Sequence, residues 1–312
     1  MTPWVSLLAM AVALLIDRRW GEPPAWAHPV VAMGRYLGRL GPRLTTWRPR
    51  WAFLGGMLAW CLGAMAVLAL AWAVQFGLSG LHGAVQALLL GLLLKPLLAW
   101  RMLRDEVASV ERALGDSLEA GQVRLQRLVS RDVTQLDKVA VRESAIESLA
   151  ENLNDSLVAP LLWFAVGGLG GAALYRFANT ADAMWGYRGR YEWAGKWAAR
   201  VDDVLSWLPA RITALLLCLA AARSPAWSAI RRQARATPSP NGGWPMGVMA
   251  LLLGVRLSKP GVYVLNEAGE PPRAMHTAQA LAWAQSAVWW AAALCAGLIL
   301  LPWAPTWAWG RA

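Results

Sequence analysis

The chain has 312 residues, of which 57% are hydrophobic and only 16% are charged, and it contains 21 tryptophans. A mean hydropathy of +0.37 excludes an ordinary soluble globular protein and indicates an integral membrane protein. The net charge of +11 does not indicate a nucleic-acid partner, because no strongly basic run is interleaved with aromatic residues.

Long apolar runs, broken by polar connections, account for the hydrophobic excess. Three of them are nearly free of charge and long enough to cross a hydrocarbon core of about 30 Å, with Lys95 the single charge among them. We therefore predict an all-α integral membrane protein with about four to six membrane segments in one membrane domain, 1–312. The segments are expected at 3–16, 51–74, 81–100, 157–175, 204–222 and 283–303.

The first run, 3–16, is short, and the basic pair Arg18–Arg19 follows it rather than preceding it. A secretory signal has basic residues first and a small-residue cleavage site afterwards, so we predict an uncleaved anchor with its N-terminus outside. Arginines and lysines then gather in the connections 17–50 and 101–156, while 75–80 carries no charge. The positive-inside rule places both basic connections in the cytoplasm and the short link outside.

The connection 101–156 keeps a helical apolar period. The connection 223–282, also expected in the cytoplasm, is rich in proline and glycine, so it is either an ordered loop region or a flexible one. The run 157–175 is interrupted by the GGLGG sequence at 167–171, and the basic segment 176–204 follows it. A re-entrant or broken segment at 157–175 would keep 176–204 on the cytoplasmic side. We expect this arrangement, because irregular backbone is tolerated at membrane depth where protein buries it.

The segment 142–155 contains four carboxylates at steps of four residues: Glu143, Glu147, Glu151 and Asp155. In a helix they form one slanting row, named here the acidic stripe, in which like charges repel by a few tenths of a kcal/mol per pair. A single acid in such a loop is most often a solvated charge. Together with Asp182, Asp202 and Asp203, however, these acids gather beside apolar runs, and carboxylates of this kind suit Mg²⁺ held with substrate phosphates.

Other polar residues near the apolar runs fit the same chemistry. Arginines provide the forked donors that phosphates prefer, and asparagines add neutral oxygen ligands. His28 is a candidate base, phosphate contact or capping group. The three cysteines lie inside apolar runs and are interpreted as small buried hydrophobic residues. Neither glycine-rich nucleotide-binding loop, G-x-x-x-x-G-K-[ST] or G-x-G-x-x-G, occurs in the chain.

Five segments, in the same order along the chain as the motifs of a known family, carry a resemblance that runs from about Asp17 to about Leu265. They are Gly21–Pro23 with His28–Val30 and Gly34; Glu147–Trp163; Asn179–Arg188; Ala199–Ala214; and Asn241–Leu257. In this order they resemble the GDP…HPV…G, ES.AEN..D..VAPL.W, NT.D.M.GYR, AR.DD….PAR.TA and N.GWP…MA..LGVRL motifs of the adenosylcobinamide-phosphate synthase family, membrane enzymes of cobalamin biosynthesis. The chain departs from these motifs at Glu22, Ala183 and Ser206, where Asp, Ser and Asn are usual.

The resemblance implies an ATP-dependent ligase that joins a carboxyl group of adenosylcobyric acid, a cobalt corrinoid, to the amine of (R)-1-amino-2-propanol phosphate. It implies a multi-pass protein of the inner (plasma) membrane, with its active site on the cytoplasmic side and other late cobalamin-pathway membrane enzymes as partners. A membrane transporter and a non-catalytic scaffold of corrinoid assembly are the alternatives. We expect catalytic roles for His28, Glu147, Glu151, Asp155 and Asp182. The Mg²⁺ ligands are expected among Glu151, Asp155, Asp182, Asp202 and Asp203. Contacts to substrates or phosphates are expected from Arg131, Asn152, Asn179, Arg188, Arg200, Arg211 and Asn241.

Overall fold

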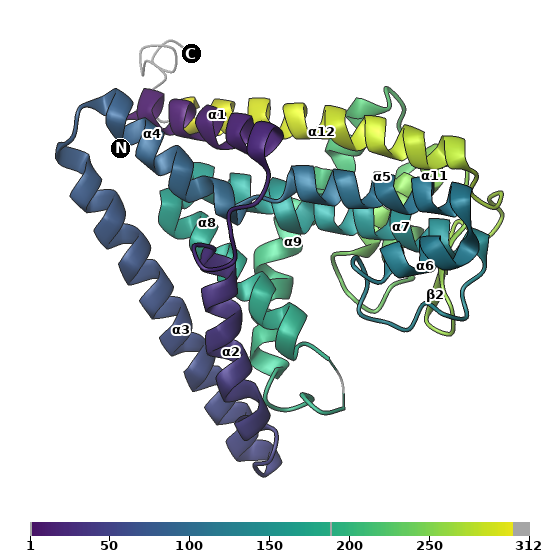
Figure 1. Cartoon of the computed structure of the whole chain (residues 1–312), viewed down its shortest axis with the longest axis horizontal. Coiled ribbons are helices and arrows are strands. Elements are labelled where there is room, and N and C mark those ends of the chain that lie inside the picture. Colours follow the sequence, from purple (N-terminus) through teal and green to yellow (C-terminus); the bar gives the residue numbers. More distant parts are fainter. Residues whose placement is uncertain (1, 188, 302–312) are drawn as a thin grey trace, which may run out of the picture. The chain divides into compact units, whose positions relative to one another are not determined.

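The computed structural model describes residues 2–187 and 189–301, so the expected phosphate contact Arg188 lies outside the described residues. Helices dominate the described chain, which confirms the predicted all-α membrane fold (Figure 1). Within the described residues, five helical segments are long and apolar enough to cross a membrane, namely 49–80, 83–116, 138–185, 196–220 and 274–300. The expected anchor 3–16 lies in α1 (Pro3–Trp20), which is not one of these five.

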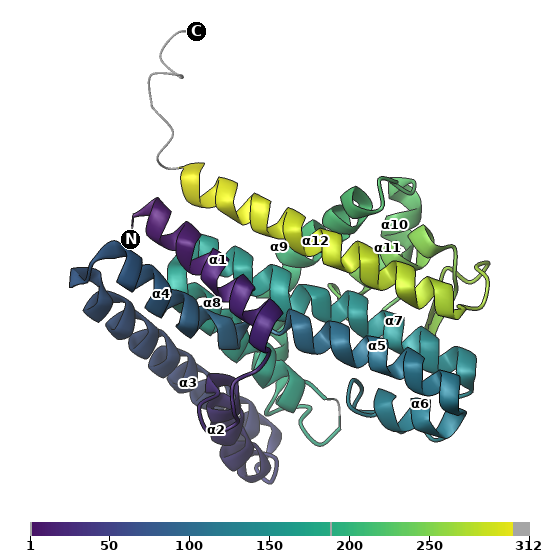
Figure 2. The same ribbon diagram turned by 45° about the horizontal axis from the view of Figure 1, so that its top comes forward.

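The residues divide into two compact units. The first comprises the described parts of 1–98, 160–199 and 291–312, and the second comprises 99–159 and 200–290. In the first unit, α1 packs beside α4 (Gly83–Leu94), and α2 (Pro29–Leu44) packs on α3 (Pro49–Gly77) (Figures 1 and 2).

The predicted break at GGLGG is a reversal of the chain inside α8 (Ala159–Trp185). Gly168 has φ 61° and ψ −151°, a backbone conformation that is open almost only to glycine. A Cβ on Gly171 would clash with the backbone carbonyl of Trp163, although eight residues of straight helix would separate the two by about 12 Å. The two halves of α8 therefore form a tight helical hairpin.

The second half of α8 runs antiparallel to α3. Leu169 N–H donates to Gln75 Oε1 near the C-terminus of α3, and Phe177 packs on Trp60 with ring centroids 5.8 Å apart. Further along the chain, the backbone of Ala194 lies against Gly56. Within this unit, the chain after the reversal thus returns to the end of α3 that carries Arg48 and Arg50, as the re-entrant interpretation of 157–175 requires.

The expected continuous segment 81–100 is interrupted. Helix α4 ends at Leu94, a 3₁₀ turn η2 covers Lys95–Leu97, and α5 (Trp100–Asp116) begins a new helix. Pro96 explains the break, because proline has no N–H group to continue an α-helix and its ring clashes with the preceding turn.

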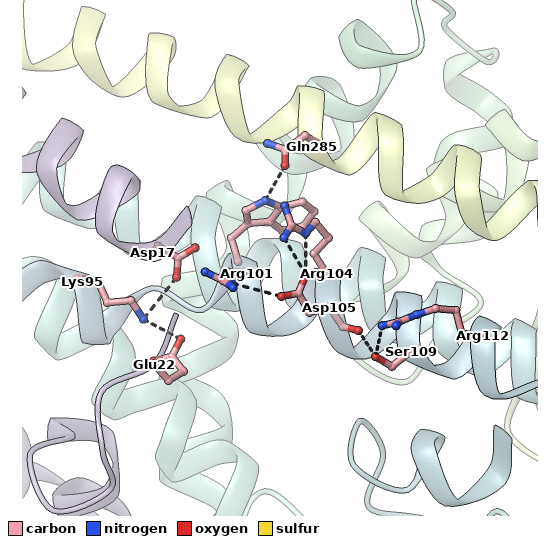
Figure 3. A network of polar contacts seen from close by, with 10 residues as sticks. Asp17, Glu22, Lys95, Arg101, Arg104, Asp105, Ser109, Arg112 and Gln285 are labelled. Carbon is pink, nitrogen blue, oxygen red and sulfur yellow. Dashed lines mark hydrogen bonds and ion pairs between the residues drawn. The ribbon is translucent and has the colours of Figure 1, made fainter. Parts of the chain in front are cut away.

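The second unit contains two of the connections that the sequence placed in the cytoplasm, 101–156 and 223–282. They are ordered: they contain α6 (Leu118–Leu125), α7 (Lys138–Leu153), α10 (Trp227–Ala234), α11 (Gly243–Leu253) and an antiparallel strand pair, β1 (Leu257–Lys259) and β2 (Tyr263–Leu265). Helix α9 (Lys196–Ala220) contains Pro209, and α12 (Ala274–Leu300) follows the strands. Trp100 at the start of α5 donates its indole N–H to Gln285 of α12 at 3.1 Å (Figure 3).

A π-helical turn, η3 (Asn154–Val158), follows α7 directly. A π turn inserts one extra residue and leaves a helical carbonyl without its usual partner, and such turns are frequent at functional sites. Here the carbonyl of Ser156 accepts a hydrogen bond from the N–H of Ala99, at 3.0 Å. The extra residue also changes the direction of Asp155 relative to the three glutamates before it.

Candidate active site

The acidic stripe faces the interior of the second unit and is not a solvated surface. Glu143 and Glu147 are 1% and 5% exposed, and Glu151 and Asp155 are half-buried. Buried carboxylates need cations or hydrogen-bond donors, because an uncompensated buried charge costs several kcal/mol. Each member of the stripe is described below with the groups that surround it.

Arg131 provides a positive charge beside Glu147. Its Nη2 donates to Ser144 Oγ at 2.6 Å and lies 3.7 Å from Glu147 Oε2. The other carboxylate oxygen, Glu147 Oε1, is buried, and the hydroxyl of Tyr263 also lies beside this carboxylate.

Glu143 fixes the strand pair. Its carboxylate accepts hydrogen bonds from Ser258 Oγ and from Arg256 Nε, the latter at 3.3 Å. The pair in turn carries Tyr263, whose hydroxyl lies 3.7 Å from Met246 Sδ. Burial raises the pKa of Tyr263, and the nearby carboxylates of Glu147 and Glu151 raise it further, so the phenol stays protonated. Sequence reasoning did not select Tyr263, which lies just beyond the last family motif.

The loop at Asn241 connects Glu151 to Arg211. Asn241 Oδ1 accepts from Arg211 Nη1 at 3.0 Å, and Asn241 Nδ2 donates to the carbonyl of Asp203 at 2.7 Å. The next residue, Gly242, lies against Glu151, since a Cβ there would sit 3.0 Å from Glu151 Oε1. Four residues that the sequence selected from three separate segments are thereby gathered in one unit.

Arg211 is held by neutral groups and aromatic rings. Its guanidinium carbon lies 4.3 Å from the ring centre of Trp207 and 4.7 Å from that of Trp244. Its nitrogens also donate to the carbonyls of Trp207 and Pro240, at 2.5 and 3.4 Å. The guanidinium is thus rigidly oriented by partners that do not neutralise its charge, which is a suitable arrangement for an anion.

Asp155 is tied to α9 by two residues that sequence reasoning missed. Asn154 Nδ2 donates to Asp155 Oδ1 at 2.8 Å, and Asn154 Oδ1 accepts from Thr213 Oγ1 at 3.0 Å. Asn154 and Thr213 are 2% and 0% exposed. Both belong to the matched family segments, so a search for buried polar residues beside the selected acid would have found them.

Other selected residues of this unit have different surroundings. Asn152 donates to the carbonyl of Ser148 one turn back in α7, at 3.0 Å, which is a local helix contact. Arg200 is exposed and Asp202 is buried.

In the first unit, His28 belongs to a polar cluster that also includes Glu22, Lys95 and Asp17. Lys95 Nζ lies 2.8 Å from Glu22 Oε1 and 3.4 Å from Asp17 Oδ1 (Figure 3). His28 Nε2 lies 3.1 Å from Glu22 Oε2, and His28 Nδ1 accepts the N–H of Val30, which caps α2. Because both ring nitrogens are occupied, this geometry favours a capping and orienting role for His28 over that of a general base.

Asn179 and Asp182 lie on the returning half of α8. Asn179 Oδ1 accepts from Arg176 Nη1 at 3.2 Å, and the half-buried carboxylate of Asp182 folds back against Gly186. Their expected approach to Glu151 and Asp155 would join residues of the two units, and it stays a prediction.

An apolar pocket of about 720 Å³ lies in the first unit, between α2, α3, η2 and the second half of α8. Its walls include Tyr36, Gly63 and Phe177, and also Ala27, Pro29 and Pro96, which are direct neighbours of His28 or Lys95 in the chain.

Comparison with known proteins identifies the chain's relatives. The family model described as CobD/Cbib protein matches residues 10–293. This chain belongs to the CobD/Cbib family. A probable cobalamin biosynthesis protein CobD of Pyrococcus abyssi is 41% identical over 82% of this chain and 84% of its own length. The cobalamin biosynthesis proteins CobD of Rhodobacter capsulatus (41% identity, 84% and 85% coverage) and Stutzerimonas stutzeri (38%, 90% and 95%) are also similar.

Membership of the CobD/Cbib family confirms the resemblance to adenosylcobinamide-phosphate synthases and places the chain among cobalamin biosynthesis proteins. With five helical segments suited to crossing a bilayer, it is a multi-pass membrane protein. No solved structure matches the chain.

Proposed function

We propose that this protein is an adenosylcobinamide-phosphate synthase, which forms the amide between adenosylcobyric acid and (R)-1-amino-2-propanol phosphate at the expense of ATP. The observation that carries the proposal is the Asn241 loop, which contacts Arg211 and Asp203 and places Gly242 against Glu151. An anion-binding guanidinium and carboxylates that suit a cation thus lie on the same loop, as phosphoryl transfer requires.

The acids present fit Mg²⁺ in a particular way. Among residues 2–187 and 189–301, no three His, Cys, Asp or Glu side chains are grouped to hold a metal ion by themselves. Mg²⁺ usually takes only one or two carboxylates and completes its octahedron with water and substrate phosphates. Glu151 and Asp155, both half-buried on one helical path, are the expected protein ligands, with Asp203 beside Asn241 as a further candidate. The ion would neutralise charge on the transferred phosphoryl group.

The reaction needs an activated carboxyl group, because a free carboxylate is a poor electrophile. Transfer of the γ-phosphoryl group of ATP to the corrinoid carboxylate gives an acyl phosphate and ADP. The amine nitrogen then attacks the acyl carbon, phosphate leaves, and the nitrogen loses a proton. Arg211 would hold a phosphate, and the buried carboxylate of Glu147 would accept that proton.

Both substrates and ATP are cytoplasmic in this proposal, so the connections 17–50, 101–156 and 223–282 and the segment 176–204 face the cytoplasm of a cell whose inner membrane holds the protein. Other membrane enzymes of late cobalamin synthesis are the proposed partners.

Ligation by the purified protein tests the proposal. In detergent or nanodiscs it should form adenosylcobinamide phosphate from the two substrates only when ATP and Mg²⁺ are present, with ADP and phosphate released in equal amounts, as followed by mass spectrometry. It should also restore cobalamin-dependent growth to a strain that lacks its own synthase. Product formed without a nucleotide, or no product with all substrates present, would reject the proposed reaction.

A further inference from the structure

Lys95 is the single charged residue of the apolar run 81–100, and it is only 3% exposed. It stands where α4 ends and the 3₁₀ turn η2 begins. A buried ammonium at the end of an apolar helix is costly unless it is paired, and ionisable residues in such segments commonly serve function.

The lysine is paired with two carboxylates on two other chain segments. Asp17 is in the last turn of α1, and Glu22 is in the connection to α2, at 3.4 and 2.8 Å from Nζ (Figure 3). The Asp17 side chain is buried, with 2% of its surface exposed, whereas the side chains of Glu22 and His28 are 20% and 15% exposed. The cluster therefore has a closed end at Asp17 and an accessible end at Glu22 and His28.

The hydrogen bonds determine the tautomer of His28. A backbone N–H can only donate, so Nδ1 carries no proton where it accepts from Val30, and the proton of the neutral ring is on Nε2. Nε2–H then donates to Glu22 Oε2, while Glu22 Oε1 faces the ammonium of Lys95. One oxygen of Glu22 thus accepts a hydrogen bond from His28 and the other forms an ion pair with Lys95, so the carboxylate is oriented from both sides.

We propose that Lys95 is a positioning residue: it holds the Glu22 carboxylate in its orientation, and through Glu22 it holds His28 in the Nε2–H tautomer at the start of α2. The inference rests on the proposed function in one respect, since it assigns Glu22 and His28 a part in ligation. No matched family motif includes Lys95. Its role follows from the contacts alone.

A purely structural ion pair would be complete with Asp17 alone. The shorter of the two Lys95 contacts, however, is made to the accessible carboxylate of Glu22. That carboxylate is also hydrogen-bonded to the ring of His28 and so orients it. A carboxylate that is accessible and held from both sides is a suitable group for orienting a bound substrate.

The test uses the full-length protein in nanodiscs with ¹⁵N-labelled histidine. The chain has three histidines, so the His28 signals can be assigned with a His28→Gln variant. The tautomer of His28 and the kinetic constants of ligation are then compared in Lys95→Met, Lys95→Arg and the matched control Lys138→Met, which changes an exposed lysine.

We expect Lys95→Met to lose the pure Nε2–H tautomer and to lower kcat about tenfold or more with little change in KM. Lys95→Arg should restore most of the Nε2–H tautomer and most of kcat, and Lys138→Met should match the unchanged protein in both quantities. A folded Lys95→Met protein with an unaltered His28 spectrum would overturn the inference, even if its thermal stability were lower.

Should Lys95→Met not fold, Glu22→Gln decides, because it leaves the Lys95–Asp17 pair in place. Its His28 signals must change, and unchanged signals would overturn the inference. If instead the unmodified protein does not ligate while the tautomer still depends on Lys95, the proposed function fails and the positioning role stands.

Discussion

Gln75 Oε1 accepts a hydrogen bond from the backbone N–H of Leu169 at 3.0 Å, between residues 94 positions apart in the chain. This contact stabilises the tip of the α8 hairpin at the end of α3 that is remote from Arg48 and Arg50. The amide group thus satisfies a backbone donor that the reversal at Gly168 removes from the helical pattern.

The reversal should depend on the glycine at its centre. Gly168→Ala puts a side chain where φ is +61° and where a Cβ would lie 2.5 Å from Gln75 Oε1, so we expect a loss of about 1–3 kcal/mol. Thermal unfolding in detergent measures this as a lower midpoint. Gly167→Ala is the control, because a Cβ there meets nothing within 4 Å. Equal midpoints for the two variants would contradict the hairpin geometry.

Membrane topology can be measured by thiol labelling. Cys61, Cys218 and Cys295 are free and are first replaced by alanine. Single cysteines at the exposed positions Glu192 and Pro240 should resist an impermeant reagent in intact cells and react after lysis, because both segments are expected in the cytoplasm. A cysteine at Ser79, in the uncharged link, should be labelled from outside. Labelling at Glu192 in intact cells would reject the re-entrant topology.

Glu151→Gln keeps the shape of the side chain and removes the charge beside Gly242. If Glu151 binds Mg²⁺ with the nucleotide, the variant should lose ligation about 100-fold or more at limiting Mg²⁺ and recover in part when Mg²⁺ is raised. Initial rates over a Mg²⁺ series measure this. Glu119→Gln, on exposed α6, serves as the control. Full activity of Glu151→Gln at limiting Mg²⁺ would show that this part of the acidic stripe does not bind the ion.

Arg211→Lys retains a positive charge but loses the planar fork and the stacking on Trp207 and Trp244. We expect the KM of one phosphate-bearing substrate to rise about tenfold or more, because lysine cannot replace a stacked, bidentate guanidinium. Steady-state kinetics with ATP and aminopropanol phosphate varied separately identify which one. The exposed Arg232→Lys is the matched control. Unchanged constants for both substrates would exclude Arg211 from phosphate binding.

The remaining aspartates should separate into two groups. Asp182→Asn is expected to abolish ligation while the protein still accumulates in the membrane. Asp203→Asn should also be severe, because its carboxylate lies 3.5 Å from the side-chain amide nitrogen of Asn241, whereas buried Asp202→Asn should act mainly through stability. Membrane abundance and specific activity of each variant are measured together. Three active variants, or three that merely fail to accumulate, would make these acids structural.

The sequence by itself determined the membrane class, the expected segments and the family, because these depend on local composition and on motifs of consecutive residues. The break at GGLGG was also readable, since glycines so closely spaced interrupt an apolar helix. The acidic stripe followed from the period of the α-helix alone.

Tertiary structure decided what the stripe faces and which distant residues join it. Burial of Glu143 and Glu147, the link from Asp155 through Asn154 to Thr213, and the contact of Asn241 with Arg211 all depend on how helices pack, which no local pattern encodes. Lys95 shows the same limit. In the sequence it is a lone charge at the end of an apolar run, and only folding brings Asp17 and Glu22 to it, because a buried charge must be compensated by whatever segments the fold places nearby.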